Sequence, residues 1–528
     1  MISRIAARAP HAGAAPRPEI DNLDSYLDDA AHYPGGHARG VLRARSTDEI
    51  SACLRTTHRI LPIGAQSSLT GGATPFGDVV LSTDRLNSIS IAGEQARVDA
   101  GATLQSLQDV LARSGRWLPP VPTYLGAFAG GAVATCAAGA ATFKYGTVRG
   151  WVEGLTIVLA GGDVLTIARG ECVASEEGVF EIETSTGVRI VRIPDIRMPD
   201  VPKCSAGYFL KPGMDLIDLF IGSEGTLGVI SQVIFKTASK PGAACRAFVP
   251  VPTEAAAIAM TGELRLASQE TWRALDASGI DIAAIEHLDA RSLAVIREDG
   301  IDRRLEIALP SGAAVGLLID LELPAHDATL WAQLESARDP ASADTPLLRF
   351  CRLLDRHGVL DDTEIALPAD HARAAAFAEL REAVPAGVNR RVALARRGDT
   401  AISKTAADMI VPFDRFGEMM SECRRLFAKR DLDVAVWGHI SDGNVHPNVL
   451  PRSAADVQSG RDAILELGTA VIAMGGCPLA EHGVGRNPIK QQLLRQLYGD
   501  YGVNAMHAIK LSLDPNGSLA SGVIFPTQ

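Results

Sequence analysis

Three loops of small residues, each next to a predicted strand, constrain the fold of this chain more than any other feature. They span residues 64–72, 119–146 and 222–228. Side chains no larger than Ala or Ser let backbone N–H groups approach a large anionic ligand closely. Phe128 and Leu227 lie within the loops, which indicates buried loops and not flexible connectors. These loops contain neither the dinucleotide-binding motif GxGxxG nor the P-loop motif GxxxxGK[ST]. They therefore predict that a large anionic cofactor is bound by a fold other than a Rossmann or P-loop domain.

Composition narrows the class of protein. The 528 residues allow about two to four domains, and 47% of them are hydrophobic, as in globular proteins. The net charge of −11 argues against a nucleic-acid partner. The sequence contains no run of about 18 apolar residues, so it predicts no integral membrane segment. The eight cysteines are scattered without a CxxC pair, so we expect a cytoplasmic protein without a locally encoded iron–sulfur or zinc-ribbon site. The sequence is compatible with a homodimer.

Hydrophobic periodicity predicts alternating strands and helices. A capping box at Ser46 to Glu49 predicts a helix that ends near Thr57. Strands are predicted at 59–63, 79–83, 96–100, 154–160, 229–235 and 314–321. Helices are predicted at 104–114, 328–337, 370–384 and 413–429. Residues 171–202 are predicted to form an irregular insertion, and the composition changes near 239–241.

Two histidines flank a turn near the C-terminal end of the chain. His439 and His446 stand on either side of Asp442-Gly443-Asn444, and Glu481 and His482 follow later. Such a turn can bring two imidazoles to one point. Two imidazoles and a carboxylate leave a coordination position open on a divalent metal, which is typical of catalytic sites. Glu481 would be the third ligand, and His482 would be free to move a proton.

Several motifs together resemble those of a flavoprotein family. They are residues 62–75, residues 122–131, Lys-Tyr-Gly-Thr at 144–147 and Gly-Ser-Glu-Gly-Thr-Leu-Gly at 222–228. These are similar to the FAD-contacting loops of the PCMH-type, or vanillyl-alcohol oxidase, flavoproteins. The later half, with Glu-His-Gly-Val-Gly at 481–485, resembles the FAD-linked oxidase C-terminal domain of D-lactate dehydrogenases, D-2-hydroxyglutarate dehydrogenases and the glycolate oxidase D subunit.

The resemblance implies an α+β fold. It implies a PCMH-type FAD-binding domain of two α+β subdomains, plus an α+β cap domain with an antiparallel sheet. We expect a disordered leader at 1–20, the FAD-binding domain at 21–238, and a substrate domain with the metal site at 239–487. Residues 488–528 are expected to return to the FAD-binding domain.

The resemblance also implies site residues. Non-covalent FAD would be bound by Pro62, Gly64, Ala65, Gln66, Ser67, Ser68, Pro122, Thr123, Gly126, Gly130, Gly131, Thr135, Gly139, Tyr145, Gly146, Thr147, Glu224, Gly228, Val229 and Ile230. The metal ligands would be His439, His446 and Glu481, with zinc, manganese or iron as the metal, and His482 would be the catalytic base. Arg381 would bind a substrate carboxylate with two parallel hydrogen bonds, and Lys404 is a second cation for that role.

The chain departs from the family pattern in its first loop and at residue 136. Gln66 and its neighbours read Ile-Gly-Ala-Gln-Ser-Ser, where relatives often have Arg-Gly-Gly-Gly-Thr-Ser. Cys136 replaces a common asparagine. The tail at 514–522 also lacks the usual Asn-Pro-Gly-Lys ending.

These features predict oxidation of a small D-2-hydroxy acid to its 2-keto acid, with hydride passing to FAD and then to an unknown electron acceptor. Three alternatives stay open: a metal-dependent hydrolase, a non-catalytic FAD subunit of a multi-subunit dehydrogenase, and an alkylglycerone-phosphate synthase-like or alditol-oxidising flavoenzyme.

Overall fold

The chain divides into two compact units. The computed structural model describes residues 3–11, 13–120, 122–324, 330–335, 337–339 and 344–527. Unit 1 consists of Met1–Gly139, Gly146–Lys240 and Cys477–Gln528, and unit 2 consists of Ala140–Tyr145 and Pro241–Gly476. The crossing at Lys240 lies where the composition changes. The return to unit 1 comes at Cys477, earlier than the expected residue 488, so unit 2 contains His439 and His446, and Glu481 belongs to unit 1.

Unit 1 contains a parallel sheet and an antiparallel sheet. The parallel sheet has the order β2 (His37–Arg43), β4 (Phe76–Ser82) and β3 (Ile60–Ile63). The antiparallel sheet has the order β5 (Ile89–Ala92), β6 (Gln95–Asp99), β12 (Val229–Lys236), β8 (Val152–Val158) and β9 (Val164–Ala168). The helices of this unit are α1 (Thr47–Thr56), α2 (Leu104–Ala112), α3 (Ala129–Ala134), α5 (Leu216–Phe220) and α14 (Pro488–Leu513). Short strands β7 (Arg116–Trp117) and β13 (Ala238–Ser239) pair with each other.

The helix α1 begins as the capping box predicts. The Ser46 side chain accepts a hydrogen bond from the Glu49 backbone N–H. Its buried residues Ile50, Cys53 and Leu54 join a core with residues of β2, β3, β4, β8, β9 and β12. Burial of this apolar side therefore fixes the helix between the two sheets.

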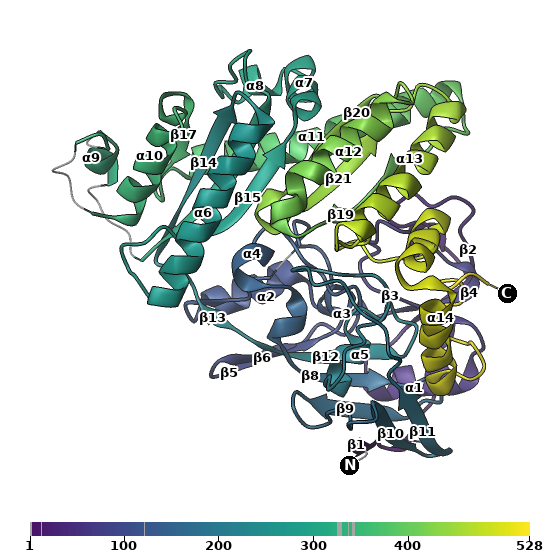
Figure 1. The fold of residues 1–528 in the computed structure, drawn as a ribbon. Helices are drawn as coiled ribbons and strands as arrows, with labels where there is room; N and C mark the ends of the chain where they lie inside the picture. Colours follow the sequence, from purple (N-terminus) through teal and green to yellow (C-terminus); the bar gives the residue numbers. More distant parts are fainter. Residues whose placement is uncertain are drawn as a thin grey trace. The chain divides into compact units, whose positions relative to one another are not determined.

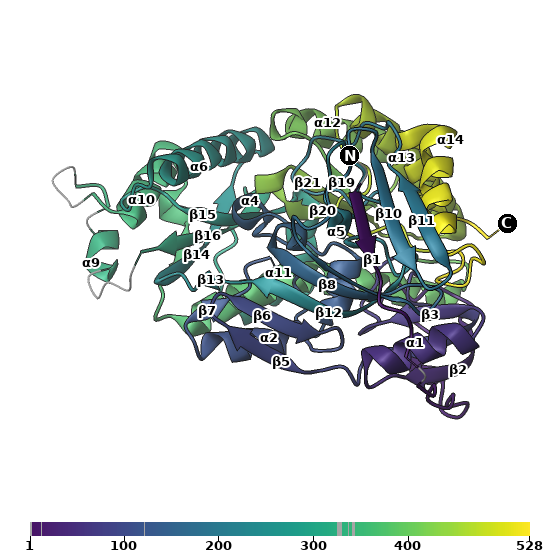
Figure 2. The ribbon, with the colours of Figure 1, turned by 90° about the horizontal axis from the view of Figure 1, so that it is seen from below.

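A third sheet occupies residues for which the sequence predicted no regular structure. Strand β1 (Ser3–Ala6) pairs with β10 (Val179–Thr184), which pairs with β11 (Gly187–Arg192), and β11 packs beside α14 (Figure 2). A strand therefore lies within the range expected to be a disordered leader, and two strands lie within the range expected to be an irregular insertion. Two interactions stabilise this sheet: β1 is hydrogen-bonded to β10, and Phe180 and Ile182 of β10 are completely buried.

Unit 2 is built on one eight-stranded sheet in which every pair is antiparallel (Figure 1). Its order is β17 (Glu364–Ala366), β14 (Ala243–Val251), β16 (Val315–Leu323), β15 (Ile282–Leu288), β20 (Val434–His439), β21 (Asn444–Val449) and β18 (Thr405–Ala406), with β19 (Met409–Ile410) also on β21. This is the antiparallel cap sheet that the resemblance implied.

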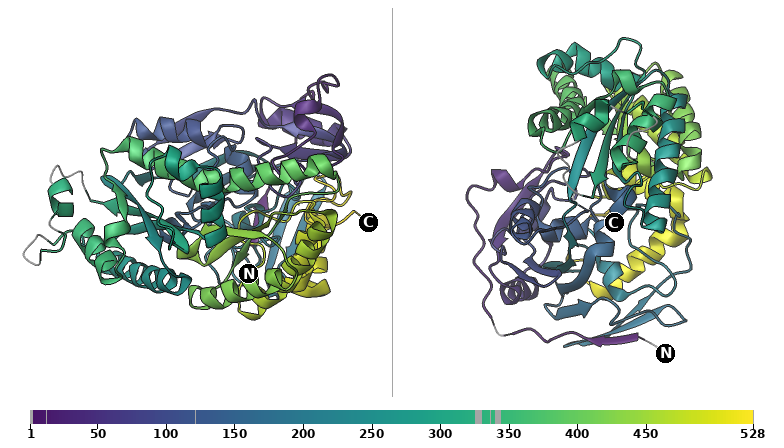
Figure 3. Two further views of the ribbon diagram at one scale, coloured as in Figure 1. Left: turned by 90° about the horizontal axis from the view of Figure 1, so that it is seen from above. Right: turned by 90° about the vertical axis from the view of Figure 1, so that its left-hand side faces the viewer.

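Helices cover the sheet of unit 2. They are α4 (Thr142–Tyr145), α6 (Glu254–Ala274), α7 (Ala290–Glu298), α8 (Ile301–Arg304), α9 (Leu330–Glu335), α10 (Pro346–Arg356), α11 (His371–Gly398), α12 (Phe416–Ala428) and α13 (Ala454–Ala473). Figure 3 shows α6 and α11 against opposite faces of the strands. Part of the predicted helix at 328–337 lies outside the described residues.

The sequence predicted a helix that ends at residue 384, before Pro385. Instead, helix α11 continues through Pro385. A proline inside a helix costs about 3 kcal/mol. On both sides of Pro385 the helix buries side chains in one core, including Phe377, Val384, Val388 and Val392. Burial of these side chains, each worth about 1.5–3 kcal/mol, outweighs the cost of the proline.

Among the helices in the described residues, none combines the length and hydropathy needed to span a bilayer.

Candidate active site

The three small-residue loops converge within unit 1. The Gly222 backbone N–H donates to the Val133 carbonyl at 3.0 Å, and the Glu224 N–H donates to the Ala134 carbonyl at 2.8 Å. The loop at 222–228 is therefore fixed against the end of α3.

The first loop packs against both of the others. A Cβ atom added to Gly64 would lie 3.5 Å from the Phe128 side chain, and one added to Gly72 would lie 3.5 Å from the Glu224 carboxylate. A Cβ at Gly131 would meet no atom within 4 Å. Three loops of small residues that meet beside open space fit a bulky anionic cofactor such as FAD.

The expected FAD residues lie in these loops and at the ends of the elements that carry them. The first group consists of Pro62 in β3 and the residues that follow this strand, Gly64, Ala65, Gln66, Ser67 and Ser68. The second group lies before, within or after α3 and around α4: Pro122, Thr123, Gly126, Gly130, Gly131, Thr135, Gly139, Gly146 and Thr147. The third group lies before and within β12: Glu224, Gly228, Val229 and Ile230. All of them except Tyr145 fall in unit 1.

Tyr145 belongs to unit 2 and its hydroxyl has a protein acceptor. It donates to the Glu322 carboxylate at 2.7 Å, while the Lys144 ammonium lies 2.6 Å from Glu322 and 2.7 Å from Asp281. Burial and the neighbouring carboxylate of Glu322 raise the pKa of Tyr145. The Tyr145 hydroxyl therefore holds the segment 140–145 to unit 2.

The two departures in the loops fall at positions with a left-handed backbone conformation. Gln66 has φ +53° and Cys136 has φ +50°, both in the left-handed region. Glycine adopts this region without strain and asparagine tolerates it better than most residues. These are the residue types that the family pattern has at the two positions. Here Gln66 is held by its side chain, which donates to the Asp28 carbonyl at 2.6 Å.

Glu224 fastens the Glu-His-Gly-Val-Gly segment to the third loop. Its carboxylate accepts hydrogen bonds from the backbone N–H groups of Val484 at 2.8 Å and Gly485 at 2.9 Å. Gly483 has φ +76°, and a Cβ there would lie 3.0 Å from the Glu224 carboxylate. Only glycine fits this close approach, so the motif fixes the backbone next to His482.

The pKa of Glu224 predicts a pH-dependent stability. Burial raises this pKa to about 7, against 4.5 for an ordinary glutamic acid, and the two N–H donors only partly offset burial. The folded state therefore binds the proton more tightly, so this contribution to stability is present below pH 4.5 and is lost as the pH rises toward 7. We expect the free energy of unfolding of the wild type to fall by about 1–3 kcal/mol relative to Glu224→Gln between about pH 5 and pH 8. Chemical unfolding of both proteins across this range measures it, and a difference independent of pH would contradict the expectation.

Glu481 is paired with a buried lysine of the same unit. The Lys203 ammonium lies 2.9 Å from Glu481 Oε2, and Lys203 is only 2% exposed. His482 Nε2 lies 3.5 Å from the other oxygen, Oε1. The Glu481 carboxylate therefore has a buried cationic partner within unit 1.

In unit 2 the chain brings His439 and His446 together. His439 ends β20, His446 lies on β21, and the turn between them includes Gly443 at φ +83°. The ring centroids are 5.5 Å apart with the planes nearly perpendicular. Both residues are buried, with exposures of 1% and 5%. The predicted turn thus places two buried imidazoles side by side.

Each imidazole faces a carboxylate through Nδ1. Glu286 Oε2 lies 3.1 Å from His439 Nδ1, and Asp408 Oδ1 lies 3.4 Å from His446 Nδ1. Asn444 donates to Asp408 at 3.1 Å and so orients it. A carboxylate beside one ring nitrogen leaves Nε2 for a metal, as is usual around metal-binding histidines. The pair therefore fits a divalent metal.

Arg381 is connected to the same pair of histidines. Its Nε lies 3.4 Å from Glu286 Oε1, and its Nη1 lies 2.6 Å from Glu382. Burial alone would raise the pKa of Glu286, but Arg381 and His439 outweigh it and hold the pKa at about 2. Glu286 thus bridges the guanidinium and the first imidazole. Lys404 is exposed in the loop before β18, and none of the described contacts joins it to this cluster.

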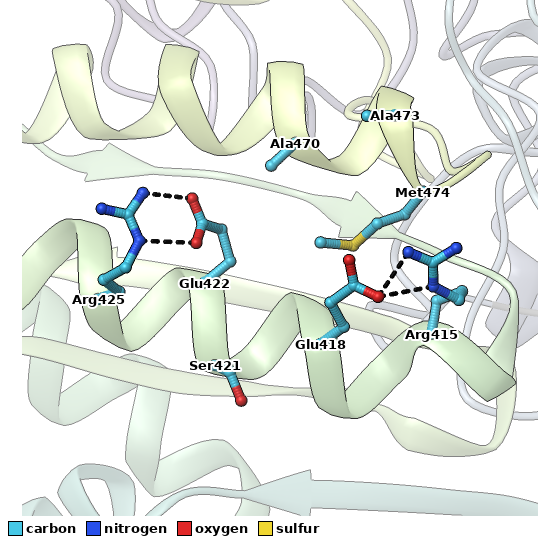
Figure 4. A pocket seen from close by; sticks show the side chains of 8 residues that line it. All are labelled: Arg415, Glu418, Ser421, Glu422, Arg425, Ala470, Ala473 and Met474. Atoms are coloured by element: carbon cyan, nitrogen blue, oxygen red, sulfur yellow. Dashed lines mark hydrogen bonds and ion pairs between the residues drawn. The ribbon is translucent and has the colours of Figure 1, made fainter.

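A surface hollow of unit 2 has no part in this cluster. It has a volume of about 350 Å³ between α12 and α13, and its charged side chains are paired with each other, Arg415 with Glu418 and Arg425 with Glu422 (Figure 4). Paired charges leave no cation there for an acid substrate.

Sequence reasoning missed Lys203, Glu286 and Asp408. Asp408 stands in the segment after Lys404, but only the strand pairing of β19 with β21 brings it to His446. Glu286 reaches His439 because it is paired with it across β15 and β20. The available sequence signal for Glu286 was a carboxylate within the mostly apolar strand β15.

Two protein families match the chain. The family described as "FAD binding domain" matches residues 38–168, and "FAD linked oxidases, C-terminal domain" matches residues 252–524, which is more than half of the chain.

Curated relatives match over nearly the whole chain. The glycolate oxidase subunit GlcD of Bacillus subtilis is 29% identical, covering 92% of this chain and 88% of that protein. A mitochondrial D-2-hydroxyglutarate dehydrogenase of Bos taurus is 27% identical, covering 93% and 78%. A D-lactate dehydrogenase of Anaerostipes hadrus is 23% identical, covering 95% and 93%.

Among solved structures, an alkyldihydroxyacetonephosphate synthase superposes with a TM-score of 0.59, covering 98% of this chain and 88% of that one. The sequence identity is 14%, so this similarity concerns the fold alone.

Proposed function

The chain belongs to the family of FAD-linked oxidases that share this C-terminal domain, and on this premise we propose that it oxidises a small D-2-hydroxy acid to the 2-keto acid. The observation that carries the proposal is the buried pair His439 and His446, each with a carboxylate on Nδ1, in a chain that also has FAD-binding loops. The names of the relatives support the substrate class, since glycolate, D-lactate and D-2-hydroxyglutarate are all small 2-hydroxy acids.

We propose that His439, His446 and Glu481 together bind a divalent metal. Imidazole and carboxylate ligands suit zinc, manganese and iron. The loops at 62–68, 122–131, 135–147 and 224–230 would hold FAD. When bound, the metal would lower the pKa of a coordinated substrate hydroxyl, and FAD would accept the hydride.

The residues of the chain then have separate roles. Arg381 binds the substrate carboxylate, because a planar guanidinium offers two parallel hydrogen bonds, and Glu286 holds that guanidinium in place. Lys404 supplies a second positive charge for the same carboxylate. His482 removes the hydroxyl proton through a ring nitrogen as the α-hydride departs. Glu224 holds the backbone at residues 484 and 485, which limits the movement of His482.

The test is a panel of 2-hydroxy acids mixed anaerobically with the purified protein. We expect the flavin absorbance to bleach with one or a few D-enantiomers and not with their L-enantiomers. Pre-treatment with a chelator should slow the bleaching by at least about tenfold, and added divalent metal should restore it. Colourless protein that contains metal would favour the metal-dependent hydrolase instead. Yellow protein that no acid bleaches would favour the non-catalytic FAD subunit.

A further inference from the structure

Two cysteines that are far apart in the sequence meet in unit 1. The sulfur atoms of Cys204 and Cys477 lie 3.4 Å apart. The segments that carry them run side by side, because the Ser205 backbone N–H donates to the Leu479 carbonyl at 2.9 Å and the Ser205 hydroxyl donates to the Ala480 carbonyl at 3.0 Å. Neither cysteine belongs to the metal site or the FAD loops described above.

We propose that Cys204 and Cys477 are a redox-active thiol pair, which a hydroperoxide converts to a disulfide that cross-links the segment carrying Glu481 to the segment carrying Lys203. A disulfide has a sulfur–sulfur distance of about 2.05 Å, so the two sulfurs need approach by only about 1.3 Å. The hydrogen bonds of Ser205 already hold the two backbones side by side next to these sulfurs.

The two thiols differ in a way that suits successive steps. Cys204 is half-buried, whereas Cys477 is buried. The hydrogen bond with Cys477 lowers the pKa of Cys204 to about 7. Thiolate character and access together decide which cysteine a peroxide attacks. Cys204 is therefore the attacking thiol and Cys477 the resolving thiol.

Three of the other cysteines provide the contrast. Burial raises the pKa of Cys53 to about 11 and the pKa values of Cys245 and Cys351 to about 12. Buried neutral thiols react slowly with peroxides. These three cysteines should therefore react more slowly with a hydroperoxide than Cys204 does.

The chemistry balances with the hydroperoxide as the only oxidant. The Cys204 thiolate attacks one peroxide oxygen, the O–O bond breaks, and Cys204 becomes a sulfenic acid as hydroxide, or an alkoxide, leaves. The Cys477 thiol then attacks the Cys204 sulfur, the S–O bond breaks, and water leaves. In total two thiols lose two electrons and two protons, and the hydroperoxide gains them.

The cross-link would act on the segment that ends in Glu481 and His482. Lys203, which is paired with Glu481 at 2.9 Å, is the residue before Cys204. A covalent bond between residues 204 and 477 therefore restrains both partners of this ion pair. We expect slower amide exchange in residues 477–482, and this expectation does not depend on the proposed reaction.

The experiment oxidises the full-length protein with hydrogen peroxide, blocks the remaining thiols and maps disulfides by mass spectrometry. We expect a peptide linking Cys204 to Cys477, loss of two of the eight free thiols, reversal by dithiothreitol, and at least about threefold slower exchange at 477–482. Cys204→Ser and Cys477→Ser should each abolish the linked peptide, whereas Cys53→Ser should leave it unchanged.

Eight free thiols after treatment would overturn the proposal. A first disulfide between other cysteines, or over-oxidised Cys204 without a linked peptide, would overturn it equally. Mapping of the wild type alone decides the question if a serine variant fails to fold.

Discussion

Replacement of His482 by asparagine is expected to lower the rate of flavin reduction by substrate about 10²–10⁴-fold, while FAD stays bound. Asparagine keeps a polar side chain of similar length but cannot accept the substrate proton at neutral pH. The segment is held from its other side by Glu224, so the substitution should not release it. Rapid mixing with substrate under anaerobic conditions measures the bleaching rate directly.

His58→Asn is the matched control, since His58 is an exposed histidine of the same unit. It should bleach at the wild-type rate. If His482→Asn also bleaches at that rate, with its FAD content intact, another group must remove the proton and the role given to His482 is wrong.

Replacement of His439 by alanine is expected to lower metal affinity more than about a hundredfold and to lower turnover with it. Changes to groups outside the ligand set typically cost 10–100-fold, so loss of a ligand should exceed about that range. Asp408→Asn keeps His446 but removes the charge next to its Nδ1, and should therefore fall within about 10–100-fold. Metal analysis after dialysis, combined with turnover, separates the two variants.

The control is His371→Ala, because His371 is an exposed histidine at the start of α11 in unit 2. It should keep both metal and turnover. Full metal content in His439→Ala would show that the two imidazoles have a purely structural role, even if turnover fell.

The long apolar elements of the fold were predictable because their patterns agree with their burial. The alternating run at 229–235 forms β12, and the capping box at Ser46 begins α1. The histidine pair was also predictable, since a turn between two strands leaves both imidazoles on adjacent strands.

The elements that the sequence did not predict depend on partners distant in the chain. Strands β10 and β11 are stable as a sheet with β1, which the local pattern cannot indicate. The carboxylates of Glu286 and Asp408 reach the histidines only through sheet pairing. The continuation of α11 past Pro385 depends on a core supplied by other elements. In each case a long-range contact outweighs a local preference.

The crossing of the chain at Gly476 and Cys477 matters for anyone who divides this protein into fragments. A piece covering residues 241–476 would carry both imidazoles and their two carboxylates but neither Glu481 nor His482. Such a piece would lack the residue proposed as the third metal ligand, Glu481. Comparison of metal retention by this piece and by the full chain would therefore test the role proposed for Glu481, without any need for an assay of turnover.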